Sequence, residues 1–218
     1  MPGLFITFEG GEGSGKSTQI ARLAARQRML GLDPLVTREP GGTALAEGIR
    51  ALLLDSPVTP GPLSEALLMV ASRADLVSTV IRPALAAGRI VLCDRYADST
   101  LAYQGGGRGL DNAMLDGWNS VATGGLVPDL TFLFDLDVEI GLARRTSATA
   151  TVSTNRLDRE SLEFHRRVRA RYLELAASSP ERWIVLDATA SHDQLETRVW
   201  EAFEALRRDR VKGVTAGR

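Results

Sequence analysis

The chain has 218 residues, of which 44% are hydrophobic and 24% charged, the composition of an ordinary globular protein. Its net charge of −1 gives the chain as a whole no electrostatic basis for binding nucleic acid. The single cysteine, Cys93, excludes an intramolecular disulfide framework, and its apolar neighbours predict a buried strand thiol rather than a nucleophile.

Short β-branched segments alternate with longer helical patterns along the chain, which predicts βαβ units. The expected strands, in chain order, are Leu4–Phe8, Leu35–Thr37, Ile90–Cys93, Leu130–Asp135 and Trp183–Leu186. The expected helices are Lys16–Leu30, Leu45–Leu53, Ser64–Ala87, Leu110–Thr123, Leu162–Ala177 and His192–Arg207. Strands this apolar require helices on both faces, so we expect an α/β fold with a parallel sheet of about five strands.

These elements fit one domain over residues 1–208, and residues 209–218 are expected to form a disordered tail. Ser147–Thr154, a run of small, mostly polar residues between two helical patterns, is expected to be a mobile loop. The first residues lead directly into a strand, without the basic and apolar regions of a signal peptide. No apolar stretch is long enough to span a bilayer, so we expect a cytoplasmic protein without membrane contact.

Between the first expected strand and the first expected helix, residues 10–17 read Gly-Gly-Glu-Gly-Ser-Gly-Lys-Ser and match the phosphate-binding pattern G-x-x-x-x-G-K-[ST]. Glycines allow successive backbone N–H groups to point into one concavity at a helix N-terminus. Lys16 then reaches the β- and γ-phosphates of a nucleotide, and the Ser17 hydroxyl can bind Mg²⁺. The expected phosphate-binding set is Gly10, Gly11, Glu12, Gly13, Ser14, Gly15, Lys16, Ser17 and Thr18.

An ordinary glycine-rich turn is the alternative to a phosphate-binding loop. However, the chain contains only two lysines, Lys16 and Lys212, and uses arginine almost everywhere else. A lysine at position 16 therefore indicates a site that needs an ammonium rather than a guanidinium. The Asn-Lys-x-Asp motif that reads guanine is absent from the sequence, which counts against a GTPase.

A second polar group begins at the end of the third expected strand with Asp94, Arg95 and Tyr96, and continues through Ser99-Thr100 and Tyr103-Gln104. Ligands bind at the carboxyl ends of strands in open parallel sheets. There, Asp94 can serve a Mg²⁺ water and Arg95 a phosphate. A salt bridge at the strand end explains these two residues equally well when they are taken alone.

With these segments in this order, the chain resembles the thymidylate kinase family over nearly its whole length. The other matching segments are Thr37–Thr43, Ser72-Arg73, Pro128–Asp137, Leu162–His165 and Leu186–Ala188. The resemblance implies a P-loop NTPase fold and ATP-dependent phosphorylation of thymidine monophosphate with Mg²⁺. It also implies a homodimer; Ala66–Val70 and Leu76–Ile81 fit a helical interface and core packing equally well.

The resemblance also implies roles on the acceptor side. Glu12 contacts the 3′-hydroxyl of the acceptor sugar, and Tyr103 crowds its 2′ position. Arg95 holds the acceptor phosphate. Arg73 hydrogen-bonds the thymine edge together with Thr100. The full acceptor set expected is Glu12, Arg38, Arg50, Met69, Arg73, Arg95, Ser99, Thr100, Tyr103 and Gln104, and the metal set is Ser17 and Asp94, the latter through water.

In the family, a lid, here about residues 141–159, closes over ATP and directs arginines at the transferring phosphoryl. The candidates are Arg144, Arg145, Arg156 and Arg159. Arg144 and Arg156 are favoured, and Arg159 is expected to face solvent. The expected catalytic set is Lys16, Arg95, Arg144 and Arg156. Met69 departs from the family, which usually places a phenylalanine against the thymine ring at this position.

Two other functions stay open on the residues alone. One is a kinase that prefers another nucleotide, such as deoxyuridine monophosphate. The other is a nucleotide-binding regulator that kept the fold but has little or no catalytic activity. The absence of arginine from Ser147–Thr154 favours this hypothesis. Nucleic acid and membranes are not expected partners.

Overall fold

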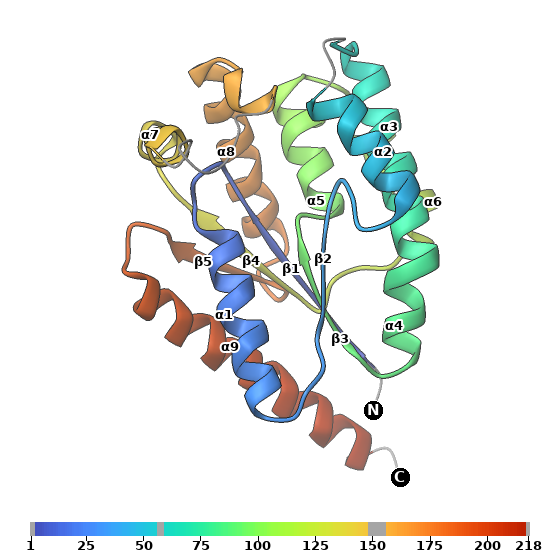
Figure 1. Cartoon of the computed structure of the whole chain (residues 1–218), viewed down its shortest axis with the longest axis vertical. Helices are drawn as coiled ribbons and strands as arrows, with labels where there is room; N and C mark the ends of the chain where they lie inside the picture. Colours follow the sequence, from blue (N-terminus) through green and yellow to red (C-terminus); the bar gives the residue numbers. More distant parts are fainter. Residues whose placement is uncertain (1–2, 56–58, 148–155, 217–218) are drawn as a thin grey trace.

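The computed structural model describes residues 3–55, 59–147 and 156–216, with side chains through Arg210, and has an α/β architecture (Figure 1). Five strands form one parallel sheet in the order β2-β3-β1-β4-β5. They are β1 (Leu4–Gly10), β2 (Leu35–Arg38), β3 (Ile90–Asp94), β4 (Leu130–Asp135) and β5 (Trp183–Asp187). The predicted sheet is confirmed, and the strands differ from the predicted ones by at most two residues at their carboxyl ends.

The helices occupy the connections between strands. They are α1 (Lys16–Met29), α2 (Ala44–Leu54), α3 (Pro62–Leu76), η1 (Val77–Ile81), α4 (Arg82–Ala86), α5 (Ala97–Thr100), η2 (Leu101–Gly107), α6 (Asn112–Thr123), α7 (Val138–Ser147), η4 (Leu157–Arg159), α8 (Leu162–Ser178) and α9 (His192–Ala216). Several start at side-chain caps: Thr43 accepts a hydrogen bond from the Ala46 N–H at 3.0 Å, and Asp111 accepts one from the Met114 N–H at 2.7 Å.

Side chains of β1 alternate between the two faces of the sheet. Ile6 and Phe8 pack in one cluster with residues of α1 and α9, which lie along one side of the sheet (Figure 1). Phe5 packs in another cluster with residues of α3, η1 and α4 on the opposite side. Because Glu9 shares the alternation of Phe5, its carboxylate lies on that second side, where α8 also packs.

The long helix predicted over Ser64–Ala87 is instead three segments, α3, η1 and α4, of which η1 is π-helical. Pro83 explains the change, because it has no N–H to donate to the preceding turn and its ring displaces the helix there. Leu76, Val77 and Ile81 are fully buried in the core. Core packing, rather than an exposed interface, therefore accounts for this apolar stretch.

The glycine run Gly105–Gly107 was not among the expected helices and belongs to η2. A Cβ on Gly106 would lie 2.7 Å from the Cβ of Arg171, and a Cβ on Gly107 would lie 2.5 Å from the ring of Phe164. The glycines therefore allow η2 to pack closely against α8, which the sequence pattern does not reveal.

Two predicted flexible segments have different outcomes. Helix α9 continues to Ala216, so the backbone is helical beyond Asp209, where the sequence predicted a disordered tail. The predicted mobile loop lies outside the described residues except for Ser147. Among the helices of the described ranges, none combines the length and the apolar character needed to cross a membrane.

Cys93 is fully buried in β3, between β1 and β2. Its thiol donates a hydrogen bond to the Arg95 carbonyl at 3.0 Å, and burial raises its pKa well above the ordinary value. The prediction of a buried strand thiol is confirmed.

Candidate active site

An open cavity of about 730 Å³ lies at the carboxyl ends of β1, β2 and β3. Its wall includes the loop after β1 (residues 12–18), the loop after β2 and the start of the loop after β3. Lys16 and Arg95, predicted to serve two different nucleotides, both line it. The size suits small-molecule ligands, and the position is the usual one for ligands in parallel α/β sheets.

Glycine is required in the loop over residues 10–17, called here the P-loop. Gly13 has a φ of 66°, and a Cβ there would lie 2.1 Å from the carbonyl oxygen of Gly141 in α7. Gly15, at a φ of 90°, is the N-cap residue of α1. A side chain at either position would therefore strain the loop or separate it from α7.

Lys16 is buried at the N-terminus of α1 and folds back onto the P-loop. Its ammonium donates to the carbonyl oxygens of Gly10 at 3.0 Å and Gly11 at 2.8 Å, and to the Ser14 hydroxyl at 3.3 Å. Burial and the positive charge of Arg95 lower the pKa of Lys16 to about 8. An anion entering the cavity would restore the preference for the charged form.

Arg95 follows β3 at a φ of 69°, in the left-handed region that non-glycine residues seldom adopt. Its Nη1 donates to the Gly10 carbonyl at 2.9 Å and to the Tyr172 hydroxyl at 3.1 Å, and its Nη2 donates to Glu12 at 2.8 Å. Of its five N–H groups, the one on Nε and one on Nη2 have no acceptor in the described part of the chain. These two groups are available to an anion in the cavity.

Glu12 is held on the same side by two donors. Its Oε1 accepts from Arg95 at 2.8 Å and from the Tyr103 hydroxyl at 2.9 Å. Burial acts to raise the pKa of Glu12, but the positive charges of Arg95 and Lys16 outweigh it and lower the pKa to about 2. Glu12 is therefore an anion at every physiological pH and can accept hydrogen bonds from a ligand.

Ser17 and Asp94 were predicted to bind Mg²⁺, and the structure brings them together: the Ser17 hydroxyl donates to Asp94 Oδ2 at 2.9 Å. Nowhere in the described ranges do three or more His, Cys, Asp or Glu side chains gather as a metal site would need. That is compatible with Mg²⁺, which prefers oxygen donors and commonly uses one or two protein ligands with substrate phosphates and water. The two residues fit the ion.

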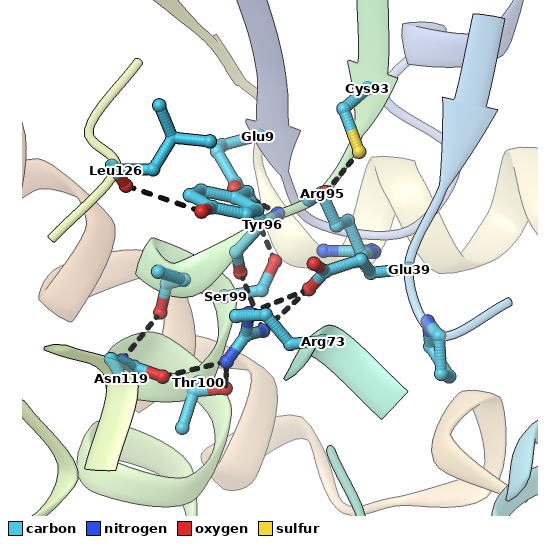
Figure 2. A network of polar contacts seen from close by, with 12 residues as sticks. Glu9, Glu39, Arg73, Cys93, Arg95, Tyr96, Ser99, Thr100, Asn119 and Leu126 are labelled. Carbon is cyan, nitrogen blue, oxygen red and sulfur yellow. Dashed lines mark hydrogen bonds and ion pairs between the residues drawn. The ribbon is translucent and has the colours of Figure 1, made fainter. Parts of the chain in front are cut away.

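Arg73 was expected to hydrogen-bond a base but is fully engaged within the protein (Figure 2). Its Nε and Nη2 donate to Glu39 Oε2 at 2.8 and 2.6 Å. Its Nη1 donates to Thr100 and Asn119, and its Nη2 also donates to the Tyr96 carbonyl. All five N–H groups thus have protein acceptors, and the side chain is only 1% exposed. In this structure Arg73 supports the cavity wall rather than offering a free donor.

The other predicted acceptor residues also line the cavity but differ in how they are held. Met69 is partly buried. The Gln104 amide Nε2 donates to Glu65 at 2.9 Å, so its carbonyl oxygen remains an acceptor. Arg38 is half exposed and pairs with Glu47 at 2.8 Å.

Arg50 donates to the Pro40 carbonyl at 2.9 Å. Burial, and next the charge of Arg38, lower the pKa of Arg50 below its ordinary value.

Ser99 lines the cavity but turns its hydroxyl toward Glu9 and Tyr172, at 2.6 and 2.7 Å. It therefore belongs to a buried hydrogen-bond network in this structure as well as to the wall.

The lid arginines fall into two groups. Arg144 lines the cavity and donates to the Ala188 carbonyl at 3.0 Å, and Arg145 lines it too while pairing with Asp158. Arg156 is not part of the cavity wall: it donates to the Leu53 carbonyl at 3.0 Å and to the buried Glu65. The structure thus does not bring Arg156 to the site where a catalytic arginine was expected. Arg159 is exposed.

Glu9 and Tyr172 were missed by sequence reasoning. Glu9 is fully buried at the end of β1, where it accepts from the Tyr96 N–H at 2.8 Å and the Tyr172 hydroxyl at 2.8 Å. A carboxylate within a buried strand was the available signal for Glu9. Tyr172 carries no such signal, because it occupies a core position of α8 like any apolar residue.

Burial, followed by the negative charge of Asp98, raises the pKa of Glu9 from 4.5 to about 7, against the opposing charges of Arg95, Lys16 and Arg182. The unfolded chain loses this proton near pH 4.5, whereas the folded chain keeps it to about pH 7. The contribution of Glu9 to stability is therefore complete below pH 4.5 and is lost as the pH rises to 7.

Glu9→Gln does not titrate, so we expect its free energy of unfolding to rise relative to wild type between pH 4.5 and 7.5, by up to about 3 kcal/mol. Urea unfolding of both proteins at pH 5, 6, 7 and 8 measures the difference. A difference that stays constant with pH would contradict this assignment of the buried proton.

Comparisons with known proteins agree with this geometry. The family model for thymidylate kinase matches residues 8–199. The chain is 56% identical to a thymidylate kinase of Thermomicrobium roseum over 207 residues, which cover 94% of this chain and 97% of that protein. It is 54% identical to one of Deinococcus radiodurans, over 92% and 96% of the two chains.

Among solved structures, that of thymidylate kinase from Ehrlichia chaffeensis superimposes with a TM-score of 0.75 at 33% identity, covering 93% of this chain and 99% of that one. Similarity of this extent covers the P-loop, the loop after β3 and the lid arginines alike. The chain belongs to the thymidylate kinase family.

Proposed function

We propose that this protein transfers the γ-phosphate of ATP to thymidine monophosphate. One observation carries the proposal: Lys16 and Arg95 both donate to the same Gly10 carbonyl oxygen and line the same cavity. A donor phosphate bound by the P-loop and an acceptor phosphate bound by Arg95 would then meet without either cation moving far. Effective proximity of this kind supplies a large share of the rate in phosphoryl transfer.

The reaction is an in-line displacement. An oxygen of the acceptor phosphate forms a bond to the γ-phosphorus, the bond from that phosphorus to the β–γ bridging oxygen breaks, and ADP leaves with the electron pair. No general base is needed, because the acceptor phosphate is largely ionised near neutral pH. The protein supplies position and positive charge where the transition state spreads negative charge.

On the donor side, the P-loop amides and Lys16 bind the phosphates of ATP. Ser17 and Asp94 would hold Mg²⁺, which when bound neutralises charge on the donor phosphates. Arg144 is the better of the two favoured lid candidates, because it lines the cavity beside Ala188. Arg156 acts at a distance by holding Glu65 in the conformation observed here.

On the acceptor side, the free N–H groups of Arg95 bind the phosphate, and Glu12 accepts from the sugar 3′-hydroxyl. Tyr103, fixed by its bond to Glu12, lies beside the 2′ position and favours deoxyribose. Arg38 and Arg50 add positive charge near the acceptor phosphate.

Two side chains, Thr100 and Gln104, recognise the base, because their contacts within the protein fix which atom of each can donate or accept a hydrogen bond. The Thr100 oxygen accepts from Arg73 at 2.9 Å, so its own hydrogen is available to a base carbonyl. Gln104 uses its amide nitrogen on Glu65, so its carbonyl oxygen can accept an N–H. A donor beside an acceptor suits the O4 and N3–H edge of thymine, with Met69 packed against the ring.

The protein acts as a homodimer in the cytoplasm under this proposal. Exposed leucines on α2 and α3, including Leu45, Leu52 and Leu63, supply an apolar surface for a second copy. Light scattering of the purified protein measures this directly.

The function is tested by ADP release in the presence of ATP and each of the common monophosphates. We expect thymidine monophosphate to have the highest kcat/KM, and deoxyuridine monophosphate, which lacks one methyl group, to be at least about tenfold lower. A higher value with another monophosphate would establish the alternative base preference. Binding of ATP and thymidine monophosphate without ADP release would establish a regulator instead.

A further inference from the structure

A buried hydroxyl–carboxylate cluster lies directly behind Arg95. Glu9 Oε2 accepts from the Ser99 hydroxyl at 2.6 Å and from the Tyr172 hydroxyl at 2.8 Å. Its Oε1 accepts from the Tyr96 N–H at 2.8 Å. Figure 2 shows Glu9 beside Ser99 and the turn that carries Arg95. The reaction proposed above gives this cluster no direct role, since none of these groups binds a phosphate there.

Tyr172 connects the cluster to Arg95, and the polarity of that contact is fixed. Arg95 Nη1 can only donate, so the Tyr172 oxygen accepts from it, at 3.1 Å. The hydroxyl has a single hydrogen, which it gives to Glu9 Oε2 at 2.8 Å or to the Ser99 oxygen at 2.7 Å. A carboxylate at position 9 thus keeps the Tyr172 hydrogen on the side away from Arg95. The lone pairs of the Tyr172 oxygen then point toward the guanidinium.

We propose that Glu9 and Tyr172 are positioning residues that orient the Arg95 guanidinium for the acceptor phosphate. The inference rests on the proposed function, because it concerns the phosphate that Arg95 binds there. Nη1 is fully used by Gly10 and Tyr172 and one N–H of Nη2 by Glu12, which leaves the Nε N–H and the other Nη2 N–H for the phosphate. Without the Tyr172 contact, Nη1 keeps only the Gly10 carbonyl as an acceptor. The guanidinium can then rotate away from the orientation that presents its remaining N–H groups to the phosphate.

An amide at position 9 reverses this polarity although it matches the carboxylate in shape. The Tyr96 N–H can only donate, so the amide oxygen must take the place of Oε1. The amide NH₂ group then takes the place of Oε2 and donates to Tyr172 and Ser99. The amide then competes with Arg95 for the lone pairs of Tyr172. The hydroxyl hydrogen of either Tyr172 or Ser99, which lie 2.7 Å apart, also loses its acceptor at Oε2. Glu9→Gln therefore tests the direction of the hydrogen bonds at position 9, because it leaves the size of the side chain unchanged.

The experiment is calorimetric titration of the full chain with thymidine monophosphate and with thymidine, which lacks the phosphate. It is done at pH 8, where Glu9, with its pKa of about 7, is ionised. We expect Tyr172→Phe to weaken binding of the monophosphate about three- to tenfold, the size of one net hydrogen bond, and to leave thymidine binding unchanged. Glu9→Gln is expected to act in the same direction and keeps the test available if Tyr172→Phe does not fold.

Tyr96→Phe is the matched control, because it also removes one buried phenol hydroxyl, here bonded to the Leu126 carbonyl at 3.2 Å rather than to Arg95. It is expected to keep the wild-type ratio of the two affinities. Equal weakening of both ligands by Tyr172→Phe, or no change in either, would overturn the positioning role.

Arg95→Lys in the same titration separates the two proposals. A selective loss of monophosphate binding in Arg95→Lys, without one in Tyr172→Phe or Glu9→Gln, overturns the positioning role alone. No selective loss in Arg95→Lys overturns both that role and the phosphate site on which it rests.

Discussion

Lys16→Ala is expected to lower the single-turnover rate of phosphoryl transfer by about 10³-fold or more, since a preorganised charge at the transferring phosphoryl has effects of this size. The fold should survive. The Gly10 carbonyl keeps Arg95 as a donor at 2.9 Å, and the Gly11 carbonyl keeps the Ser14 hydroxyl at 2.9 Å. Removing a buried cation whose pKa is already lowered to about 8 also relieves repulsion from Arg95.

Rapid-quench measurement of ADP formation with saturating ATP and thymidine monophosphate gives the rate, and thermal unfolding checks the fold. Lys212→Ala is the natural control, because it removes the only other lysine of the sequence, near the end of α9. A folded Lys16→Ala protein within tenfold of the wild-type rate would exclude Lys16 from the transfer step.

Arg95→Lys is expected to reduce kcat/KM for thymidine monophosphate by about 100-fold while the KM for ATP changes little. Lysine keeps the charge but cannot contact Gly10, Tyr172 and Glu12 while also presenting two parallel N–H groups to a phosphate. The variant should therefore bind thymidine monophosphate less tightly and bind ATP nearly as well as the wild type does.

Steady-state kinetics with each substrate varied in turn measure the split. Arg22→Lys is a matched control: Arg22 joins α1 to α9 through Asp193 and Glu196, on the sheet face opposite Glu9. An equal rise of both KM values in Arg95→Lys would indicate a general disturbance of the cavity instead of a specific acceptor contact.

Much of the fold follows from local patterns. The bounds of the buried strand Leu130–Asp135 were predicted to the residue, because four of its six residues are large and apolar, which is typical of a buried strand. The P-loop was equally clear, since its glycines and lysine are required by backbone geometry and charge together. By contrast, η2 was missed because Gly105–Gly107 has the composition of a loop, and only its contact with α8 explains the glycines.

The position of a site residue could be predicted where the local sequence places it at the end of a strand. It could not be predicted where it depends on hydrogen-bond partners that lie far away in the sequence. Arg95 could be placed because it directly follows the end of a strand. Arg156 could not, because its position depends on Glu65, which lies 91 residues away in the sequence. Arg73 shows the same limit: its location at the cavity is as expected, whereas the engagement of all its donors depends on Glu39 and Asn119.

Cys93 makes the central sheet accessible to measurement. Since its thiol is buried in the core cluster that also holds Phe5 and Leu76, a thiol reagent can modify it only when that part of the core opens. With no second cysteine in the sequence, the labelling rate of the unmodified protein reports this opening without any engineered probe. Slower labelling in the presence of nucleotide would show that a ligand in the cavity stabilises β3 against opening.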